Sequence, residues 1–176
     1  ERDFVEEMVK AMEVEDGKKI GAVQGKILHL PPDQERPRRD GERIIDTTGT
    51  VIYKNRRNFD RGQGERDEGQ YDRIEYVFWA DACAGLYNRE MLEDIAIEGE
   101  YFDETFLAYR EIIDMAWRAR ARGWEVIYTP YAIAHHHRGF SPETRREQSP
   151  FIKELSYRNR YLTLIKNDSL KGIIKH

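Results

Sequence analysis

An acidic group and a run of histidines in the second half of the chain are the residues best suited to chemistry. The acidic group contains Asp103, Glu104, Glu111 and Asp114, and the last two are three residues apart, which places them on one face of a predicted helix. Such carboxylates could act as a general base or contact a hydroxylated substrate. They could equally do no more than stabilise a helix N-terminus, whose partial positive charge favours acidic side chains.

The three consecutive histidines His135, His136 and His137 are candidate metal ligands, because neutral imidazole commonly binds metals. On an extended strand neighbouring side chains point to opposite faces, so His135 and His137 share one face and His136 lies on the other. The three therefore cannot form one three-ligand site unless the strand bends. The alternative is that one histidine packs against the sheet, another is solvated and none binds a metal.

Two further segments place polar groups beside small residues. Arg61 to Asp72 combines glycines with Arg, Asp and Tyr, which suits a hydroxyl-rich or phosphorylated ligand, although a solvated loop with internal salt bridges has the same composition. Trp79 to Tyr87 places small residues around Asp81 at the end of a predicted strand. Small side chains let a ligand approach the backbone, and they also permit tight packing of a helix on a sheet.

Alternating helices and strands must position these groups. Asn88 is a predicted N-cap and Gly123 a helix stop, and apolar spacing predicts helices over about 2–14, 89–95, 111–122 and 141–165. Strands are predicted over 20–30, 76–79, 85–87, 124–128 and 132–136, with Pro130 ending the fourth, and a short hairpin over 44–53 follows an exposed connection at 31–43. This order predicts an α/β layered fold, with too few strands for a complete Rossmann-like domain.

Composition narrows the function classes. The chain has 176 residues, a net charge of -4 and 35% charged residues with both signs interspersed, whereas nucleic-acid binders show a one-sided basic excess. Cys83 is the only cysteine, which excludes an intramolecular disulfide and a thiolate zinc cage and favours a reducing compartment. No apolar run approaches the roughly 20 residues that cross a bilayer, and the first residues do not form a signal peptide.

Several motifs occur in the order in which family 2 glycosyltransferases carry them. They are G-A-V-Q-G-K-I-L at 21–28, R-G-Q-G-E-R-D-E-G-Q-Y-D at 61–72, D-A-C-A-G-L-Y-N-R-E at 81–90, F-D-E-T-F-L-A-Y at 102–109, D-M-A-W-R-A-R-A-R-G-W at 114–124, Y-T-P-Y-A-I-A-H-H-H-R-G-F-S at 128–141 and R-N-R-Y-L-T-L-I-K-N at 158–167. Through these motifs nearly the whole chain resembles the acceptor-side half of such enzymes, and in particular their rhamnosyltransferase-like branch.

The resemblance implies a fold and a reaction. The fold would be a partial GT-A-like mixed sheet flanked by helices over residues 1–142, followed by a C-terminal helical extension over 143–176. The reaction would move a sugar, with inversion, from a nucleotide-sugar donor to a hydroxyl of a glycan or lipid-linked acceptor. A divalent metal, Mn²⁺ or Mg²⁺, would assist it.

The resemblance also assigns residues. The family's base is the Asp of an E-D-x-D motif, which falls on Ile112, so Glu111 and Asp114 are the acids that could replace it. His136 matches the family's histidine near the metal and the diphosphate, from its spacing to Gly139. The residues matching regions that line the substrates are Arg61, Asp67, Asp81, Ala84, Gly85 and Tyr109.

Finally, the resemblance implies a nucleotide-binding half with an Asp-x-Asp metal motif ahead of this region, and the chain contains no Asp-x-Asp. We therefore expect metal ligands from outside this chain, weak or no turnover by the chain alone, and a location in the cytoplasm or peripherally at the inner membrane face. Lack of that half would expose a sheet edge and apolar surface, so we also expect self-association. The alternatives are a non-catalytic binding or assembly module and a small histidine metal-binding protein.

Overall fold

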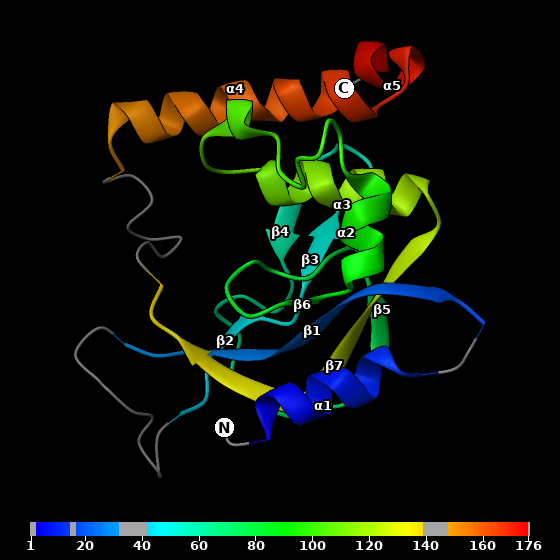
Figure 1. Ribbon diagram of the computed structural model, residues 1–176. Helices are drawn as coiled ribbons and strands as arrows, with labels where there is room; N and C mark the ends of the chain where they lie inside the picture. Colours follow the sequence, from blue (N-terminus) through cyan, green and yellow to red (C-terminus); the bar gives the residue numbers. More distant parts are fainter. Residues whose placement is uncertain (1–2, 15–16, 32–41, 139–147, 176) are drawn as a thin grey trace.

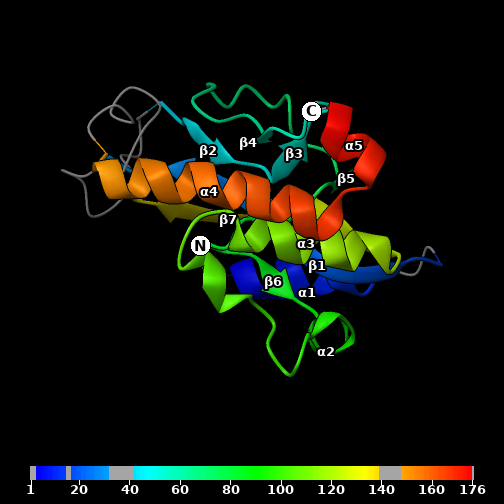
Figure 2. The same ribbon diagram turned by 90° about the horizontal axis from the view of Figure 1, so that it is seen from above.

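The computed structural model describes residues 3–14, 17–31, 42–138 and 148–175 (Figure 1). A curled mixed sheet forms the centre, with helix α1 on one face and helices α2 and α3 on the other, while α4 lies outside α3 as a further layer (Figures 1 and 2). The predicted mixed α/β arrangement is thereby confirmed. None of the helices in the described ranges has the length and apolar character needed to cross a bilayer.

The elements follow one another from α1 to α5 with one short 3-10 helix, η1, between α2 and α3. Their bounds are α1 Phe4–Met12, β1 Lys19–His29, β2 Ile45–Thr47, β3 Thr50–Ile52, β4 Asn58–Asp60, β5 Glu75–Val77, β6 Leu86–Tyr87, α2 Arg89–Ile95, η1 Glu104–Phe106, α3 Glu111–Ala121, β7 Trp124–His136, α4 Pro150–Asn167 and α5 Leu170–Lys175.

Strands β1 and β7 are the centre of the main sheet and run parallel, in the order β2-β1-β7-β5 with β6 also paired to β1. Because helices cover both faces, β1 is buried along nearly its whole length, and even Gln24 and Lys26 within it are buried. Alternate residues feed two cores: Ala22 and Val126 pack under α2 and α3, whereas Val23 and Ile127 pack against α1.

The predicted break at Pro130 is wrong, because β7 is one strand from Trp124 to His136. Its pairing with β1 moves from Gly25 opposite Thr129 to Lys26 opposite Ile133, so the three residues from 130 to 132 form a bulge. Proline lacks a backbone N–H, and a bulge is the position in a strand where that donor is not needed. The strand therefore continues past the proline and carries the histidines to its end.

The hairpin predicted over 44–53 is also wrong. Strand β2 pairs with β1 in the main sheet, whereas β3 pairs with β4 in a separate two-stranded sheet. Gly49, with φ of 113°, lies between them, and its N–H donates to Thr47 Oγ1 at 3.0 Å, so the turn sends the chain into the second sheet. As a result β4 stands beside the carboxyl end of the main sheet.

The four predicted helices are present, but the last begins later than expected, and the short helices η1 and α5 were not predicted. Helix α2 is capped by Asn88, whose side chain accepts from the Glu90 N–H at 2.8 Å, and Gly123 follows α3 with φ of 84°. Residues 141–143, the predicted start of the last helix, lie outside the described residues, as does most of the 31–43 connection. The helix that is described, α4, begins at Pro150 after an N-cap at Ser149.

Candidate functional site

The carboxyl ends of the parallel strands bring five polar residues together, which we call the strand-end cluster: Asp46, Asp60, Cys83, His136 and Arg138. In β7, His136 lies opposite His29 at the end of β1, and β2 supplies Asp46 from the other side of β1. Ligand sites of open α/β sheets commonly lie beyond the carboxyl ends of parallel strands. The cluster is therefore the candidate site that the fold itself favours.

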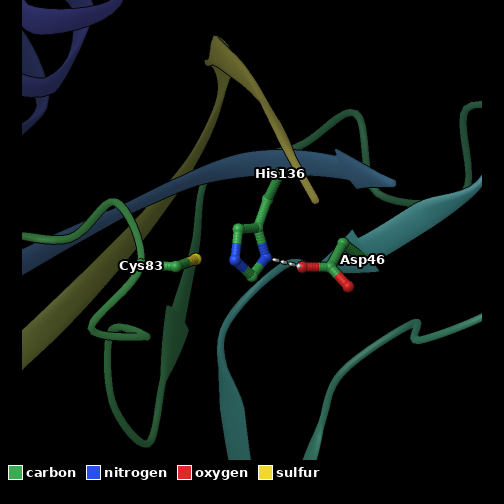
Figure 3. Close-up of side chains that lie close together, drawn as sticks. All are labelled: Asp46, Cys83 and His136. Atoms are coloured by element: carbon green, nitrogen blue, oxygen red, sulfur yellow. Dashed lines mark hydrogen bonds and ion pairs between the residues drawn. The ribbon is translucent and has the colours of Figure 1, made fainter. Parts of the chain in front are cut away.

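Asp46 fixes the orientation of His136. The carboxylate is only 2% exposed, and its Oδ2 lies 2.8 Å from His136 Nδ1 (Figure 3). A carboxylate at Nδ1 favours the proton on that nitrogen, which leaves Nε2 as the lone-pair nitrogen when the ring is neutral. Nε2 lies on the side of the ring that faces Cys83 (Figure 3).

Arg138 joins the two carboxylates of the cluster. Its Nε donates to Asp46 Oδ1 at 2.6 Å, and its Nη2 lies 2.8 Å from Asp60 Oδ2. Burial opposes the charge of Arg138, but the hydrogen bonds and charges of both carboxylates raise its pKa above the ordinary value. Burial and the nearby charge of Asp81 raise the pKa of Asp60, outweighing its attraction to Arg138.

Cys83 brings a thiol to the same place from the loop before β6. The residue is exposed, but its sulfur points towards the imidazole of His136 (Figure 3). Partial burial of the sulfur, with the charges of Asp81 and Asp46, raises the pKa of this thiol. Cys83 therefore stays protonated at neutral pH, and it is a poor nucleophile, since the thiolate is the reactive form.

The donor atoms of the cluster do not match the predicted Mn²⁺ or Mg²⁺. Asp46, Cys83 and His136 each offer one ligand atom, and these atoms lie within 4.8 Å of one another. Mn²⁺ and Mg²⁺ prefer carboxylate, carbonyl and water oxygens, whereas both oxygens of Asp46 accept hydrogen bonds and Cys83 offers sulfur. Among these three residues, a hard divalent ion would find one carboxylate, that of Asp46, and no complete set of oxygen ligands.

A second polar region surrounds the N-terminus of α3. Leu107, Tyr109 and Arg110, just ahead of the helix, have φ of 59°, 66° and 72°, a conformation that residues other than glycine rarely adopt. The buried Asn159 of α4 holds this loop, because its Nδ2 donates to three loop carbonyl oxygens at 2.8 Å each. Strained backbone held in this way is common at functional sites.

The predicted acids at this helix end have different surroundings. Asp114 is fully buried, and its oxygens lie 3.0 Å from Arg118 Nε, 3.1 Å from Lys166 Nζ and 2.8 Å from Asn167 Nδ2. Glu111 has one buried oxygen, Oε2, that finds no hydrogen-bond partner among the residues that the structure describes. Ile112 is partly buried and packs against the core under α2 and α3. This geometry favours a structural role for Asp114 and leaves Glu111 as the acid with unused hydrogen-bonding capacity.

Strand β4 connects the two polar regions. Asn58 Oδ1 accepts from Arg110 Nη1 at 2.6 Å, and Asp60 pairs with Arg138. Since Asn58 and Asp60 are two residues apart on one strand, their side chains share a face and lie about 7 Å apart along it. The N-terminus of α3 and the strand-end cluster therefore flank one face of β4.

The loop residues predicted to bind substrate are largely paired within the protein. Arg61 bonds to Glu75, and its guanidinium lies 4.5 Å from the centre of the Tyr71 ring. Asp67 is buried and lies 2.9 Å from the equally buried Lys26, beside an open pocket of about 460 Å³ next to the β7 bulge. Both residues are thus paired with residues outside the 61–72 loop, on β5 and β1, and the expected salt bridges within the loop do not describe them.

The small-residue segment lies next to the cluster. The Asp81 N–H donates to Gln24 Oε1 at 2.6 Å, and Asp81 Oδ1 accepts from the Cys83 N–H at 3.1 Å. At Gly85 an added Cβ would lie 2.9 Å from the Asp81 carbonyl oxygen, so close packing requires glycine there. Of the predicted substrate residues, Asp81 and its neighbours Ala84 and Gly85 therefore lie nearest to His136, whereas Tyr109 belongs to the α3 region.

Three residues of the strand-end cluster could not be singled out from the sequence: Asp46, Asp60 and Arg138. Asp46 ends a short apolar run and precedes a Thr-Thr-Gly turn, a signal that resembles any strand end. Asp60 lies in a polar segment that reads as loop but forms β4. Arg138 follows the histidines directly, and only the common partner Asp46 shows that it belongs with them.

Comparison with known proteins gives this chain no relative: no family model, no curated protein and no solved structure matches it. Its function has to be argued from its own residues and their geometry.

Proposed function

We propose that this chain is the acceptor-side part of an inverting glycosyltransferase, which moves a sugar from a nucleotide-sugar to a glycan or lipid-linked hydroxyl. The observation that carries the proposal is that β4 joins the N-terminus of α3, where the motifs locate the base, to the cluster containing His136. A nucleotide-sugar donor and the unpaired, exposed Cys83 both suit a cytoplasmic location.

Inverting transfer needs a base for the acceptor hydroxyl and positive charge or donors for the departing diphosphate. Ile112 accepts no proton, and Asp114 is held by three donors, so Glu111 is the acid left for the first task. At the other end of β4, the charge of Arg138 is balanced by two carboxylates. That leaves His136 to face the leaving group, and its Nε2 can donate to the diphosphate only when the ring is protonated. With both functions weakened, the chain alone should turn over slowly or not at all.

The test is to restore the base. With the nucleotide-binding half supplied, the wild type, Ile112→Asp and Ile112→Asn, which has the size of aspartate but no charge, are incubated with Mn²⁺ and UDP-glucose, dTDP-rhamnose or GDP-mannose, and release of nucleotide diphosphate is measured. An aspartate at this partly buried position would have a raised pKa, as a general base requires. We expect a gain of about tenfold or more for Ile112→Asp and none for Ile112→Asn.

Two results contradict the proposal. Equal rates for the Asp and Asn variants would show that position 112 does not hold the base. Robust turnover by the unchanged chain alone would contradict the expected weak or absent turnover, and would show that Glu111 or another residue already serves as base.

A second candidate is a non-catalytic binding or assembly module. The observation in its favour is that the carboxylates best placed by sequence, Asp114 and Asp67, are buried in internal ion pairs. Calorimetric titration with methyl rhamnoside and methyl glucoside separates the two candidates. Sugar binding that is unchanged in Ile112→Asp, with no turnover in either form, supports the module and contradicts the enzyme.

A further inference from the structure

The outer side of the C-terminal helices is unusually apolar for a surface facing solvent. We call it the α4–α5 outer face; its six large apolar residues, each between 46% and 86% exposed, are Phe151, Tyr157, Tyr161, Ile165, Leu170 and Ile174. Helix α4 forms the outermost layer and runs across the molecule, with α3 between it and the sheet, and α5 continues from its end (Figures 1 and 2).

This apolar face is distinct from the side of α4 that packs on the protein. Leu155, Asn159 and Thr163 recur every four residues and are buried. Tyr157 and Tyr161, with Ile165 one turn further, recur with the same spacing but are offset by two residues, about 200° around the helix. Helix α4 is therefore buried on one side and apolar on the opposite, exposed side, and contiguous exposed apolar surface of this kind marks an interaction site.

The charge of this segment points to the kind of partner. Residues 150–175 contain six Lys or Arg and two Asp or Glu, a net charge of +4, in a chain whose total is -4, so the remainder carries -8. In α5, Lys171 and Lys175 alternate with the exposed Leu170 and Ile174. A basic segment with apolar and aromatic side chains on an otherwise acidic protein is complementary to an anionic apolar interface.

We propose that the α4–α5 outer face binds the surface of a membrane rich in anionic lipids, with both helices lying in the plane of the interface. Leu170, Ile174 and Ile165 would enter the boundary between headgroups and acyl chains. Tyr157 and Tyr161, whose rings pack edge to face with centroids 5.1 Å apart, would keep their hydroxyls among the headgroups. A second copy fits less well, because two segments that each carry a net charge of +4 would repel each other.

Sedimentation with lipid vesicles tests this surface independently of any sugar transfer. The full chain is mixed with vesicles of pure phosphatidylcholine or of equal parts phosphatidylcholine and phosphatidylglycerol. We expect binding to the anionic vesicles, binding to the neutral ones that is weaker by about tenfold or more, and release by salt at about 0.5 M, where screening is strong.

Variants assign the binding to the helices. Lys171→Glu with Lys175→Glu should weaken binding to anionic vesicles about tenfold or more, and Ile165→Glu should weaken it comparably. The matched control is Val5→Glu, the same kind of change at an exposed position of the acidic helix α1, which should leave binding unchanged.

Three outcomes overturn the proposal. One is equal sedimentation with neutral and anionic vesicles, and another is no sedimentation with either. The third is a dimer in light scattering that Ile165→Glu converts to a monomer while vesicle binding is unaffected, which would mean that a second copy covers the face. Because all the substitutions are at exposed positions, circular dichroism should show native folding for each.

Discussion

Asp46 and Asp114 are both almost completely buried, yet the two aspartates are used differently. Asp114 lies between α3 and α4 and is bonded by Arg118, Lys166 and Asn167. Asp46 lies at the carboxyl end of the sheet and is bonded by His136 and Arg138. The surroundings of Asp114 are closed, whereas the partner of Asp46, His136, keeps 37% of its side chain exposed.

The difference shows that the role of a buried carboxylate, structural or functional, depends on whether its partners are also buried. A buried charge needs partners, and when those partners are also buried the network can only hold elements together. When a partner reaches the surface, the buried carboxylate orients a group that can still meet a ligand. Asp46 and His136 are of this second kind, although sequence spacing made Glu111 and Asp114 the more prominent acids.

The largest effect should follow from breaking the bonds that Asp114 makes with Arg118, Lys166 and Asn167, which we call the closed network. Asp114→Ala leaves Arg118 and Lys166 without their shared carboxylate between α3 and α4, so we expect a loss of about 3–5 kcal/mol in the free energy of unfolding. Urea denaturation followed by circular dichroism measures it. Glu93→Ala, which removes an exposed ion pair with Arg89, is the control and should change stability by less than about 1 kcal/mol.

The helices and strands could be predicted because their signals are local. The bounds and N-cap of helix α2 are predictable because Asn88 precedes an apolar helical pattern, and β1 is predictable because apolar residues lie on both sides of Gln24 and Lys26. The hairpin over 44–53 failed because pairing is decided by distant strands: β1 and β4 each take one of the two segments. The predicted strand end at Pro130 is wrong because the bulge is defined by the pairing of β7 with β1, which the local sequence around the proline does not indicate.

The candidate site was only partly predictable for the same reason. His136 could be singled out from its neighbours because of strand alternation and motif spacing. Its partner Asp46 lies 90 residues away, and nothing local distinguishes Asp46 from other polar residues at strand ends. Arg138, only two residues from His136, is linked to it through the same carboxylate. Conversely, the sequence suggests a catalytic role for the acids at the start of α3, and only the fold shows that the Asp114 carboxylate is already bonded by Lys166 and Asn167.

An intermediate effect should follow from weakening the bonds that Asp46 makes with His136 and Arg138, which we call the open network. Asp46→Asn removes the charge but keeps one acceptor oxygen, and Arg138 keeps Asp60, so we expect a loss of about 1–2 kcal/mol in the free energy of unfolding. The same variant should lose the fixed tautomer of His136, visible as a change in its ring ¹⁵N shifts. Asp60→Asn is the control: its loss should be smaller, with the His136 shifts unchanged, because the bond from Asp46 remains. Equal losses for Asp46→Asn and Asp114→Ala would contradict the distinction between the networks.

The smallest effect concerns the rim of the closed network and depends on pH. Asp103 bonds to Lys166, which also serves Asp114, and the hydrogen bond from Lys166 lowers the pKa of Asp103 from 3.8 to about 2. Because the folded-state pKa is depressed, Asp103 stabilises the fold fully above about pH 4, and that contribution is lost as the pH falls towards 2. Asp103→Asn, which keeps an acceptor for the Thr105 N–H, should therefore lower stability at pH 6 by about 1 kcal/mol, allowing for solvent screening.

Urea midpoints of the wild type and Asp103→Asn at several pH values check this contribution. The two curves should be separated at pH 6 and approach each other as the pH falls from about 4 towards 2, because Asp103 becomes protonated over that range and is then as neutral as asparagine. Glu6→Gln, in an exposed pair with Lys10 on α1, should show no such convergence, since solvent screens that pair at every pH. A separation that persists unchanged to pH 2 would mean that the amide disturbs the η1 turn itself, and that the charge of Asp103 does not support the junction of α3 and α4.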